Sequence, residues 1–206
     1  QKIKIERLDI FPTQAKLLLI CAENNSAYIK GLDLWLEDDK GNRYEPKNNG
    51  ITATFSSDNE NVASLWIESS YFAKTQTLKL CINGIQMIAK DALFGVIDYQ
   101  TGTITNLPKD VRGEEISLQG NNLHISLVGK SPKPNHTFQI AGWEYWHGDE
   151  KCSFGSRSST TGDDEYHFIE MFEIKEFDVS SQYKLKWNYG PIEALKEPIS
   201  ITLYNK

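Results

Sequence analysis

The stretch SLWIESSYFAKTQTLKLCIN, residues 64–83, recurs in weaker form as IEMFEIKEFDVSSQYKLKWN, residues 169–188. At a constant offset of 105, Ile67 meets Phe172 and identical residues meet at several further positions. Both copies alternate apolar and polar residues at every second position, which favours strands with one buried face. Self-similarity of this kind predicts a fold built from a repeated unit.

The repeat extends to both sides of these two stretches, and the offset drifts between 105 and 111 as loop insertions would make it. The further matches are LLLI (17–20) with LHISL (123–127), LWLEDDKGNRY (34–44) with EYWHGDEKCSF (144–154), and KDALFGVI (90–97) with LKEPISITL (195–203). We therefore expect two consecutive domains of one fold, residues 1–108 and 109–206, with their boundary in the polar segment TNLPKDVRGEE, residues 105–115.

Each copy predicts about seven short strands separated by turn-forming residues, and helical periodicity is almost absent. The copies lack the Cys-Trp-Cys pattern of antibody domains, so the prediction is an all-β protein made of two tandem immunoglobulin-like β-sandwich domains. A helical turn is expected at GPIEALKE, residues 190–197, because a proline suits the first helical position, and its counterpart GIQMIAKD (84–91) is similar. The Ser-rich GSRSSTTG, residues 155–162, is expected to form a flexible loop.

The composition limits the classes of partner. The chain has 22 basic and 28 acidic residues and a formal net charge of -6, the wrong sign for a surface that neutralises phosphates, so nucleic acid is not an expected partner. It contains no apolar window of 18 residues and starts at Gln1 without a methionine. We expect any membrane attachment to run through a segment that has been removed from this chain.

Three cysteines are too few for a disulfide framework. Cys21 and Cys81 lie in apolar runs, whereas Cys152 lies in a polar segment. The first two are expected to be buried thiols, because free cysteine is among the most buried residue types. A Cys21–Cys81 bridge between two strands is the alternative.

The acidic cluster Glu37, Asp38 and Asp39 is followed by Gly41 and Asn42. Carboxylates so close together could hold calcium, but the alternating ligand pattern of a calcium loop is missing. Hairpin turns use the same residue types, which cap their own backbone and tolerate positive φ. We interpret the cluster as a turn, and its echo at 144–154 as the same corner of the second domain.

His147 and Cys152 lie five residues apart in WHGDEKC, which raises the hypothesis of a hydrolase or metal site. The sequence has no paired short spacing of ligands, no G-x-S-x-G elbow and no phosphate-binding glycine loop. No catalytic, metal-binding or cofactor-binding residue is therefore predicted.

Aromatic residues cluster in AGWEYWHG, and the candidate contact residues are Trp143, Tyr145, Trp146 and His147. In a regular strand Trp143 and Tyr145 would share one face and Trp146 would take the other. One face would then expose large rings to a sugar or a protein partner. The alternative is that the rings pack against the neighbouring domain.

Several segments resemble a known group of proteins: KIERLDIFPTQAKLLL at 4–19, LWLEDDKGNRYEP at 34–46, SSYFAKTQTLKLCINGI at 69–85 and VIDYQTG at 96–102. They are similar to the uncharacterised extracytoplasmic domains of Gram-positive, single-pass membrane proteins that resemble anti-sigma factors. The resemblance covers mostly residues 2–104. It implies a sensing or interaction module on the cell surface, although this chain has no membrane segment or cytoplasmic part of its own.

Together these features predict a non-enzymatic module outside the cytoplasm that senses or binds an unknown protein or a cell-envelope ligand. The main alternative is a structural or adhesive spacer, which predicts a rigid rod. The third hypothesis is the hydrolase or metal site near His147 and Cys152, which requires their side chains to converge with a carboxylate.

Overall fold

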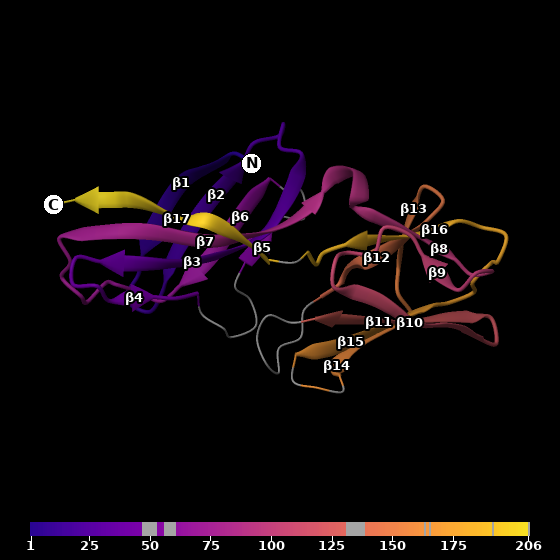
Figure 1. Cartoon of the computed structure of the whole chain (residues 1–206). Coiled ribbons are helices and arrows are strands. Elements are labelled where there is room, and N and C mark those ends of the chain that lie inside the picture. The colour runs from indigo at the N-terminus through magenta and orange to yellow at the C-terminus, as the bar shows by residue number, and fades with distance from the viewer. Residues whose placement is uncertain are drawn as a thin grey trace. The chain divides into compact units, whose positions relative to one another are not determined.

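The computed structural model describes residues 1–46, 53–55, 61–130, 139–162, 164, 166–190 and 192–205 of the chain (Figure 1). The chain divides into two compact units. Unit 1 comprises Gln1–Met87 together with Ile192–Lys206, and unit 2 comprises Ile88–Pro191. Both are built from antiparallel strands, which confirms the all-β prediction.

Unit 1 is a sandwich of two four-stranded sheets. The first sheet has the order β1 (Ile3–Ile10), β2 (Ala15–Cys21), β6 (Val62–Ile67) and β5 (Ala53–Phe55). The second has the order β17 (Ile192–Asn205), β7 (Thr77–Ala89), β3 (Ala27–Asp38) and β4 (Arg43–Tyr44).

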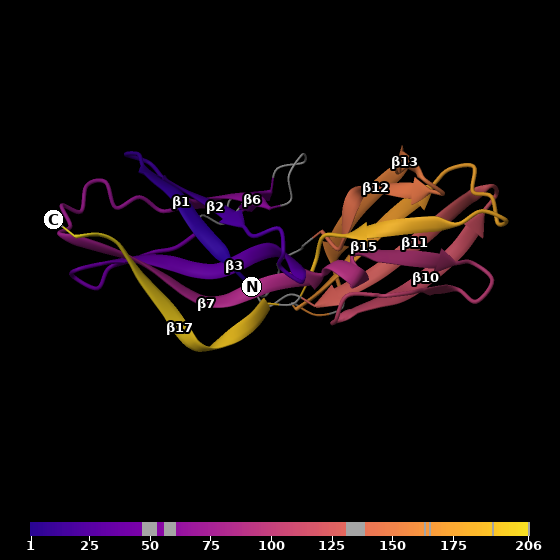
Figure 2. The same cartoon turned by 90° about the horizontal axis from the view of Figure 1, so that it is seen from above.

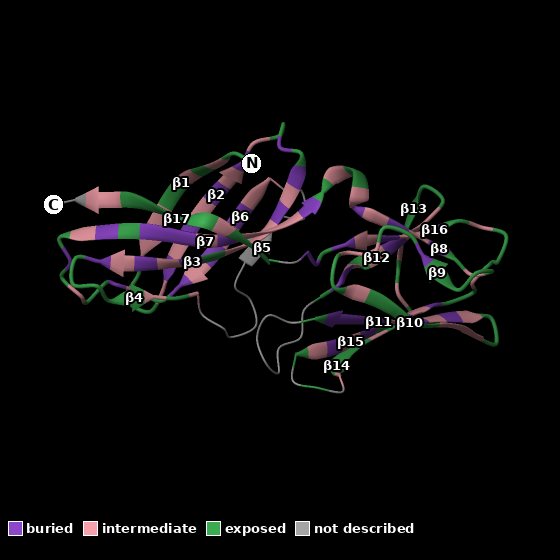
Figure 3. Ribbon diagram, in the orientation of Figure 1, coloured by how far each residue is buried: buried purple, intermediate pink, exposed green. Residues whose placement is uncertain are grey.

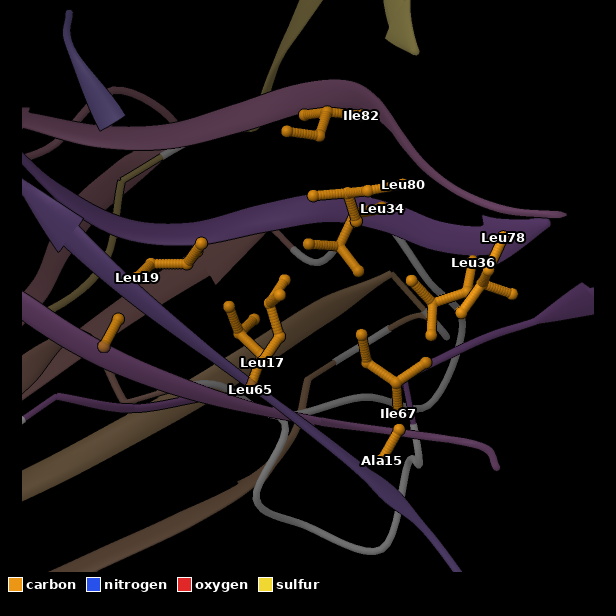
Figure 4. Close-up of a cluster of buried hydrophobic side chains, with 11 residues drawn as sticks. Ala15, Leu17, Leu19, Leu34, Leu36, Leu65, Ile67, Leu78, Leu80 and Ile82 are labelled. Atoms are coloured by element: carbon orange, nitrogen blue, oxygen red, sulfur yellow. The ribbon is translucent and has the colours of Figure 1, made fainter. Parts of the chain in front are cut away.

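The core of unit 1 follows from the alternation in its strands. Strand β2 buries every second residue, and the partly buried residues between them lie on the other face. The buried side chains of the two sheets meet between the layers, as Figure 4 shows. They are chiefly Leu17, Leu19, Leu34, Leu36, Leu65, Ile67, Leu78 and Leu80.

Unit 2 repeats this arrangement with one additional short strand. Its first sheet has the order β10 (Val111–Gln119), β11 (Asn122–Lys130), β15 (His167–Ile174) and β14 (Ser156–Thr161). Its second has the order β13 (Glu150–Ser153), β12 (Ala141–His147), β16 (Tyr183–Trp187), β8 (Phe94–Asp98) and β9 (Thr103–Ile104). The purple segments of these strands in Figure 3 mark its core, which includes Leu123, Leu127, Phe168, Phe172, Leu185 and Trp187.

The two units share one sheet order, strand for strand, and this order is that of an immunoglobulin-like sandwich. The closing strand of each unit, however, comes from the other repeat. β8 follows β7 in the chain but pairs with β16, and β17 follows β16 but pairs with β7. The colours of Figure 1 show this exchange, because the yellow β17 lies in the indigo and purple unit 1.

The exchange corrects the expected domain limits of 1–108 and 109–206. Residues 88–108 belong to unit 2, and residues 192–206 belong to unit 1. The segment 105–115 is no linker, because it turns between β9 and β10 inside unit 2 and donates a hydrogen bond from Thr105 N to Val96 O at 3.0 Å. Polar turn residues look alike at a domain boundary and within a domain, so the pattern could not separate the two.

Two local predictions were wrong. The helical turn expected at residues 190–197 is replaced by the start of β17, in which Ile192, Glu193 and Ala194 pair with β7, and a 3-10 turn lies instead at Lys90–Ala92. The expected loop at 155–162 contains β14, which pairs along its whole length with β15. In both cases tertiary strand pairing overrides a weak local preference.

The cysteines form no disulfide: Cys21, Cys81 and Cys152 are free thiols. Cys21 and Cys81 are buried, as the preferred interpretation expected, and the Cys21–Cys81 bridge is excluded. Cys81 faces the closing strand, with Sγ 3.9 Å from Oγ of Ser200. In the part of the chain that the structure describes, no helix has the length and apolar character to cross a membrane.

Candidate functional site

The acidic cluster at the end of β3 forms a turn, as predicted. Asp38 Oδ1 accepts hydrogen bonds from the backbone N of Lys40 and of Asn42, both at 2.9 Å. Asp38 Oδ2 accepts from Asn42 Nδ2 and from the Tyr44 hydroxyl, also at 2.9 Å. Gly41 completes the turn with φ of 80°, a conformation that favours glycine.

These contacts determine how Asp38 titrates. Its burial alone would raise the pKa, but the hydrogen bonds from Asn42, Tyr44 and Lys40 together lower it to about 2. Burial and the bond to Asp38 raise the pKa of Tyr44 to about 12. Every donor around Asp38 belongs to its own turn, so the carboxylate supports the β3–β4 corner.

The second copy of this corner joins β12 to β13, which confirms that both quoted stretches are the same strand-turn-strand element. His147 pairs with Glu150 across it, and its ring stacks on Tyr183 with centroids 4.6 Å apart and an interplanar angle of 7°. Cys152 pairs instead with Tyr145, and its Sγ lies 3.9 Å from the carbonyl oxygen of Glu150. His147 and Cys152 thus have different neighbours along the hairpin.

Neither residue stands in a metal-binding cluster. Throughout the described ranges, no group of three or more His, Cys, Asp or Glu side chains is arranged to hold a metal ion. Tyr145, opposite Cys152, is buried, and burial followed by the neighbouring Cys152 raises the pKa of its phenol to about 12. The surroundings of Cys152 are those of a packed hairpin.

The four candidate contact residues do not form one surface. Tyr145 is buried in the core of unit 2, and His147 is held by Tyr183. Trp146 meets Phe94 of β8 edge to face, with ring centroids 5.1 Å apart. Only Trp143 is broadly open to solvent, with 68% of its surface exposed.

Trp143 does not share the buried face of Tyr145, contrary to the expectation. The pairing of β12 with β16 shifts register between Ala141 and Tyr145, and Trp143 lies within this irregularity. The strict alternation of side chains therefore fails at this point, and the indole is not carried into the core.

Beneath Trp143 lies an ion pair between Arg157 of β14 and Glu170 of β15, whose side chains are 11% and 1% exposed. Arg157 Nε donates to Glu170 Oε1 at 2.9 Å, and Arg157 Nη2 reaches the same oxygen. Glu170 Oε2 accepts from the backbone N of Ile140 at 2.7 Å and of Ala141 at 3.2 Å. Burial raises the pKa of Glu170, and Arg157 and the two amides oppose this effect.

Arg157 also binds the strand that carries Trp143. Its Nη1 donates to the carbonyl oxygen of Gly142 at 2.6 Å, and its Nη2 donates to that of Ala141 at 2.7 Å. The guanidinium carbon lies 4.8 Å from the centre of the Trp143 ring, within the range of a cation–π contact. The pair thus joins the two sheets of unit 2 and supports one face of an exposed indole.

Sequence reasoning identified Trp143 but missed Arg157 and Glu170. Arg157 lies in the Ser-rich segment that was expected to be a loop. Glu170 stands at the position of Leu65 in the first repeat, at the offset of 105. Leu65 is a core residue, so an acid at its counterpart was the available signal of a buried polar contact.

Comparisons with known proteins place the chain as follows. The model of DUF5643, a family of unknown function, matches residues 1–118, which include β8 and not β17. No curated protein matches. A crystal structure of bovine butyrophilin covers 97% of this chain and 95% of its own, with 12% identity and a TM-score of 0.25, a similarity too low to support an inference.

Proposed function

We propose that this chain, which belongs to the DUF5643 family of unknown function, is a non-enzymatic binding module that contacts its partner through Trp143. The observation that carries the proposal is the exposed indole of Trp143, supported on one face by the buried, charged Arg157. An exposed tryptophan on a fixed strand is an effective anchor, because little conformational entropy is lost when a partner covers it.

The support beneath Trp143 favours a binding role over a chance exposure. Both oxygens of Glu170 and three nitrogens of Arg157 are engaged in internal hydrogen bonds, so the guanidinium is held in place beneath the indole. Arginine and tryptophan are the residue types enriched where binding energy concentrates. The open face of the indole is suited to stacking on a flat apolar face of a sugar ring or a protein side chain.

A spacer made of two domains in series is less well supported. Gln1 and Asn205 both belong to unit 1, and unit 2 is a continuous insertion between β7 and β17. Tension between these two residues would load the β7–β17 pairing of unit 1 and would bypass unit 2. A module whose second unit carries no tension is better suited to presenting a contact surface.

The compartment and the partner class are part of the proposal. The resemblance to extracytoplasmic domains of anti-sigma-like proteins supports a location outside the cytoplasmic membrane, and the acidic net charge of -6 suits a neutral or basic ligand of the cell envelope. Limited proteolysis of intact cells that express the complete protein tests the location. Cleavage within this region only after cell lysis would contradict it.

Binding is tested with cell-wall fragments from which proteins have been removed, and separately with divalent cations. We expect the wall fragments to raise the melting temperature and to change tryptophan fluorescence, and Trp143→Ala to remove both effects. Phe72→Ala is the matched control, because Phe72 is 76% exposed but lies in unit 1. Equal binding by the Trp143→Ala variant would overturn the proposal, and no response to any fragment would overturn the assignment of a cell-wall ligand.

A further inference from the structure

The two repeats exchange equivalent strands with each other. Leu80 of β7 pairs with Ile201 of β17, and the equivalent Leu185 of β16 pairs with Gly95 of β8. Each closing strand therefore pairs with the strand that precedes its counterpart. Both views of the chain, in Figures 1 and 2, show β17 running along β7.

The length of the connections does not force this exchange. Within one repeat, Leu80 and Gly95 are 15 positions apart, and Leu185 and Ile201 are 16 positions apart. Hairpin loops need only about 2–5 residues, so either connection is long enough to turn back and pair locally. Local closure would also involve a shorter loop, which costs less entropy. A specific interaction must therefore favour the exchanged pairing.

In unit 2 the close packing at Gly95 is specific to the exchanged pairing. A Cβ atom at this position would lie 2.2 Å from Cζ2 of Trp187 and 2.7 Å from the carbonyl oxygen of Thr105. Trp187 is 1% exposed, and in a close-packed core its ring could move only by displacing its neighbours. If unit 2 used its own closing strand, Ile201 would occupy the place of Gly95 and its side chain would collide with the indole. Strand β16 thus accommodates β8 and excludes β17.

In unit 1 a second close approach occurs at Gly84. The connections themselves pair in the exchanged arrangement, with Gln86 opposite Ile192 and Gly84 opposite Ala194. A Cβ atom on Gly84 would lie 2.8 Å from Cγ2 of Ile192 and 3.2 Å from the carbonyl oxygen of Glu193. This close approach exists only because β17 runs past β7, and glycine inside a strand is typical of such a site.

We propose that Gly95 and Gly84 select the exchanged arrangement over local closure, so that the two repeats fold as one interlocked chain. Ile88–Pro191 contains every strand of unit 2, so this unit can close first. Unit 1 stays open at β7 until β17 arrives from the end of the chain. This device concerns how the fold closes and is independent of the binding role of Trp143.

Cross-linking of the full chain through its natural Cys81 tests the proposal. In the exchanged arrangement Ser200 lies opposite Cys81, whereas local closure would bring Phe94 there, because Phe94 pairs with Lys186 at the equivalent position. In a Cys152→Ser background, Ser200→Cys should form an intramolecular disulfide with Cys81 on mild oxidation, and Phe94→Cys should not. Peptide mapping by mass spectrometry identifies the linked pair.

Transposing the two competing residues provides the decisive variant. Gly95→Ile combined with Ile201→Gly conserves composition and makes β17 the strand that fits beneath Trp187. We expect the Phe94→Cys link to Cys81 to increase about tenfold in this chain, because overpacking now opposes the exchange. Ile201→Gly alone is the control and should retain the Ser200→Cys link.

Three results would overturn the proposal. They are a Phe94→Cys link to Cys81 in the otherwise natural chain, a disulfide that joins two chains, and a transposed chain whose linkage is unchanged. Should the transposed chain fail to fold, hydrogen exchange on Gly95→Ala decides the question. Loss of amide protection in β16 with β3 and β6 unaffected supports the role of Gly95, and unchanged protection in β16 contradicts it.

Discussion

Arg157 and Glu170 form an ion pair that is almost closed to solvent, with side chains 11% and 1% exposed, on the two neighbouring strands β14 and β15. In the first repeat, the residue equivalent to Glu170 is Leu65, which packs in the apolar core. One repeat of the same fold therefore joins its sheets by hydrocarbon packing at this point, and the other joins them by charge-assisted hydrogen bonds.

Arg157→Met should destabilise the protein strongly, because it leaves the Glu170 carboxylate buried without its cation. The expected loss is about 3–5 kcal/mol of unfolding free energy. Arg157→Met with Glu170→Leu should recover part of this loss, since leucine is the residue of the first repeat at that position. Urea denaturation measures all three chains, and a double variant no more stable than Arg157→Met would contradict the explanation.

Arg7→Met is the matched control for that series. Arg7 pairs with Asp9 at 2.8 Å, but the two side chains are 62% and 31% exposed. Water already solvates this pair, so its removal should cost less than about 1 kcal/mol. A loss as large as that of Arg157→Met would show that burial is not the deciding factor.

Gly95→Ala should destabilise the protein although it adds a single methyl group. The new Cβ would lie 2.2 Å from Trp187, and overpacking of this kind costs about 1–3 kcal/mol. Gly113→Ala is the control, since Gly113 also lies in a strand of unit 2 but has no atom within 4 Å of the position of a Cβ. Thermal denaturation should show a lower melting temperature for Gly95→Ala and an unchanged one for Gly113→Ala.

The sequence predicted the strands and their repetition because alternation of apolar and polar residues is a local property. Ile67 and Phe172 are both buried at the same place in equivalent strands, as the offset of 105 required. The exchange of β8 and β17 was not predictable in this way. The two are copies of one strand, and an alignment of copies does not say which neighbour each will pair with; that choice depends on the tertiary contact between Gly95 and Trp187.

The same limit applied to the candidate site. The period of two predicted that Trp143 and Tyr145 share one face of the strand, but it could not anticipate the register shift, beside which Trp143 is exposed and Tyr145 is buried. Arg157 was missed because Ser-rich composition is typical of loops, whereas this segment is held as a strand by pairing with β15. Whether Trp143 contacts a partner stays a prediction that the binding experiment tests.

Asp38 should make the stability of unit 1 depend on pH in the acid range. Its folded pKa of about 2 lies below the value of about 3.9 expected for an unfolded aspartate. A lowered folded pKa contributes stability that is fully present above about pH 4 and is lost as the pH falls toward 2, here about 2 kcal/mol. Asp38→Asn should therefore be less stable than the natural chain at pH 7 and equally stable near pH 2. Denaturation at a series of pH values checks this, and parallel curves would contradict it.

The three thiols should react in a fixed order with a thiol reagent under native conditions. Cys152 should react first, because it is only partly buried, and Cys152→Ser should remove this fast phase. Cys21 should react last, because it faces the core of unit 1 and burial raises the pKa of its thiol, while only the thiolate is nucleophilic.

Cys81 should react between these two thiols, because it is buried next to the closing strand, with its Sγ 3.9 Å from Oγ of Ser200. β17 is largely exposed along its length and pairs irregularly, with register shifts between Ala194 and Ile199 and between Thr202 and Tyr204. Such an edge strand should open locally at a lower free energy than the whole unit unfolds. Mass spectrometry after timed labelling resolves the three sites. Labelling of Cys81 and Cys21 at one common rate would show that β17 separates from β7 only when unit 1 unfolds as a whole.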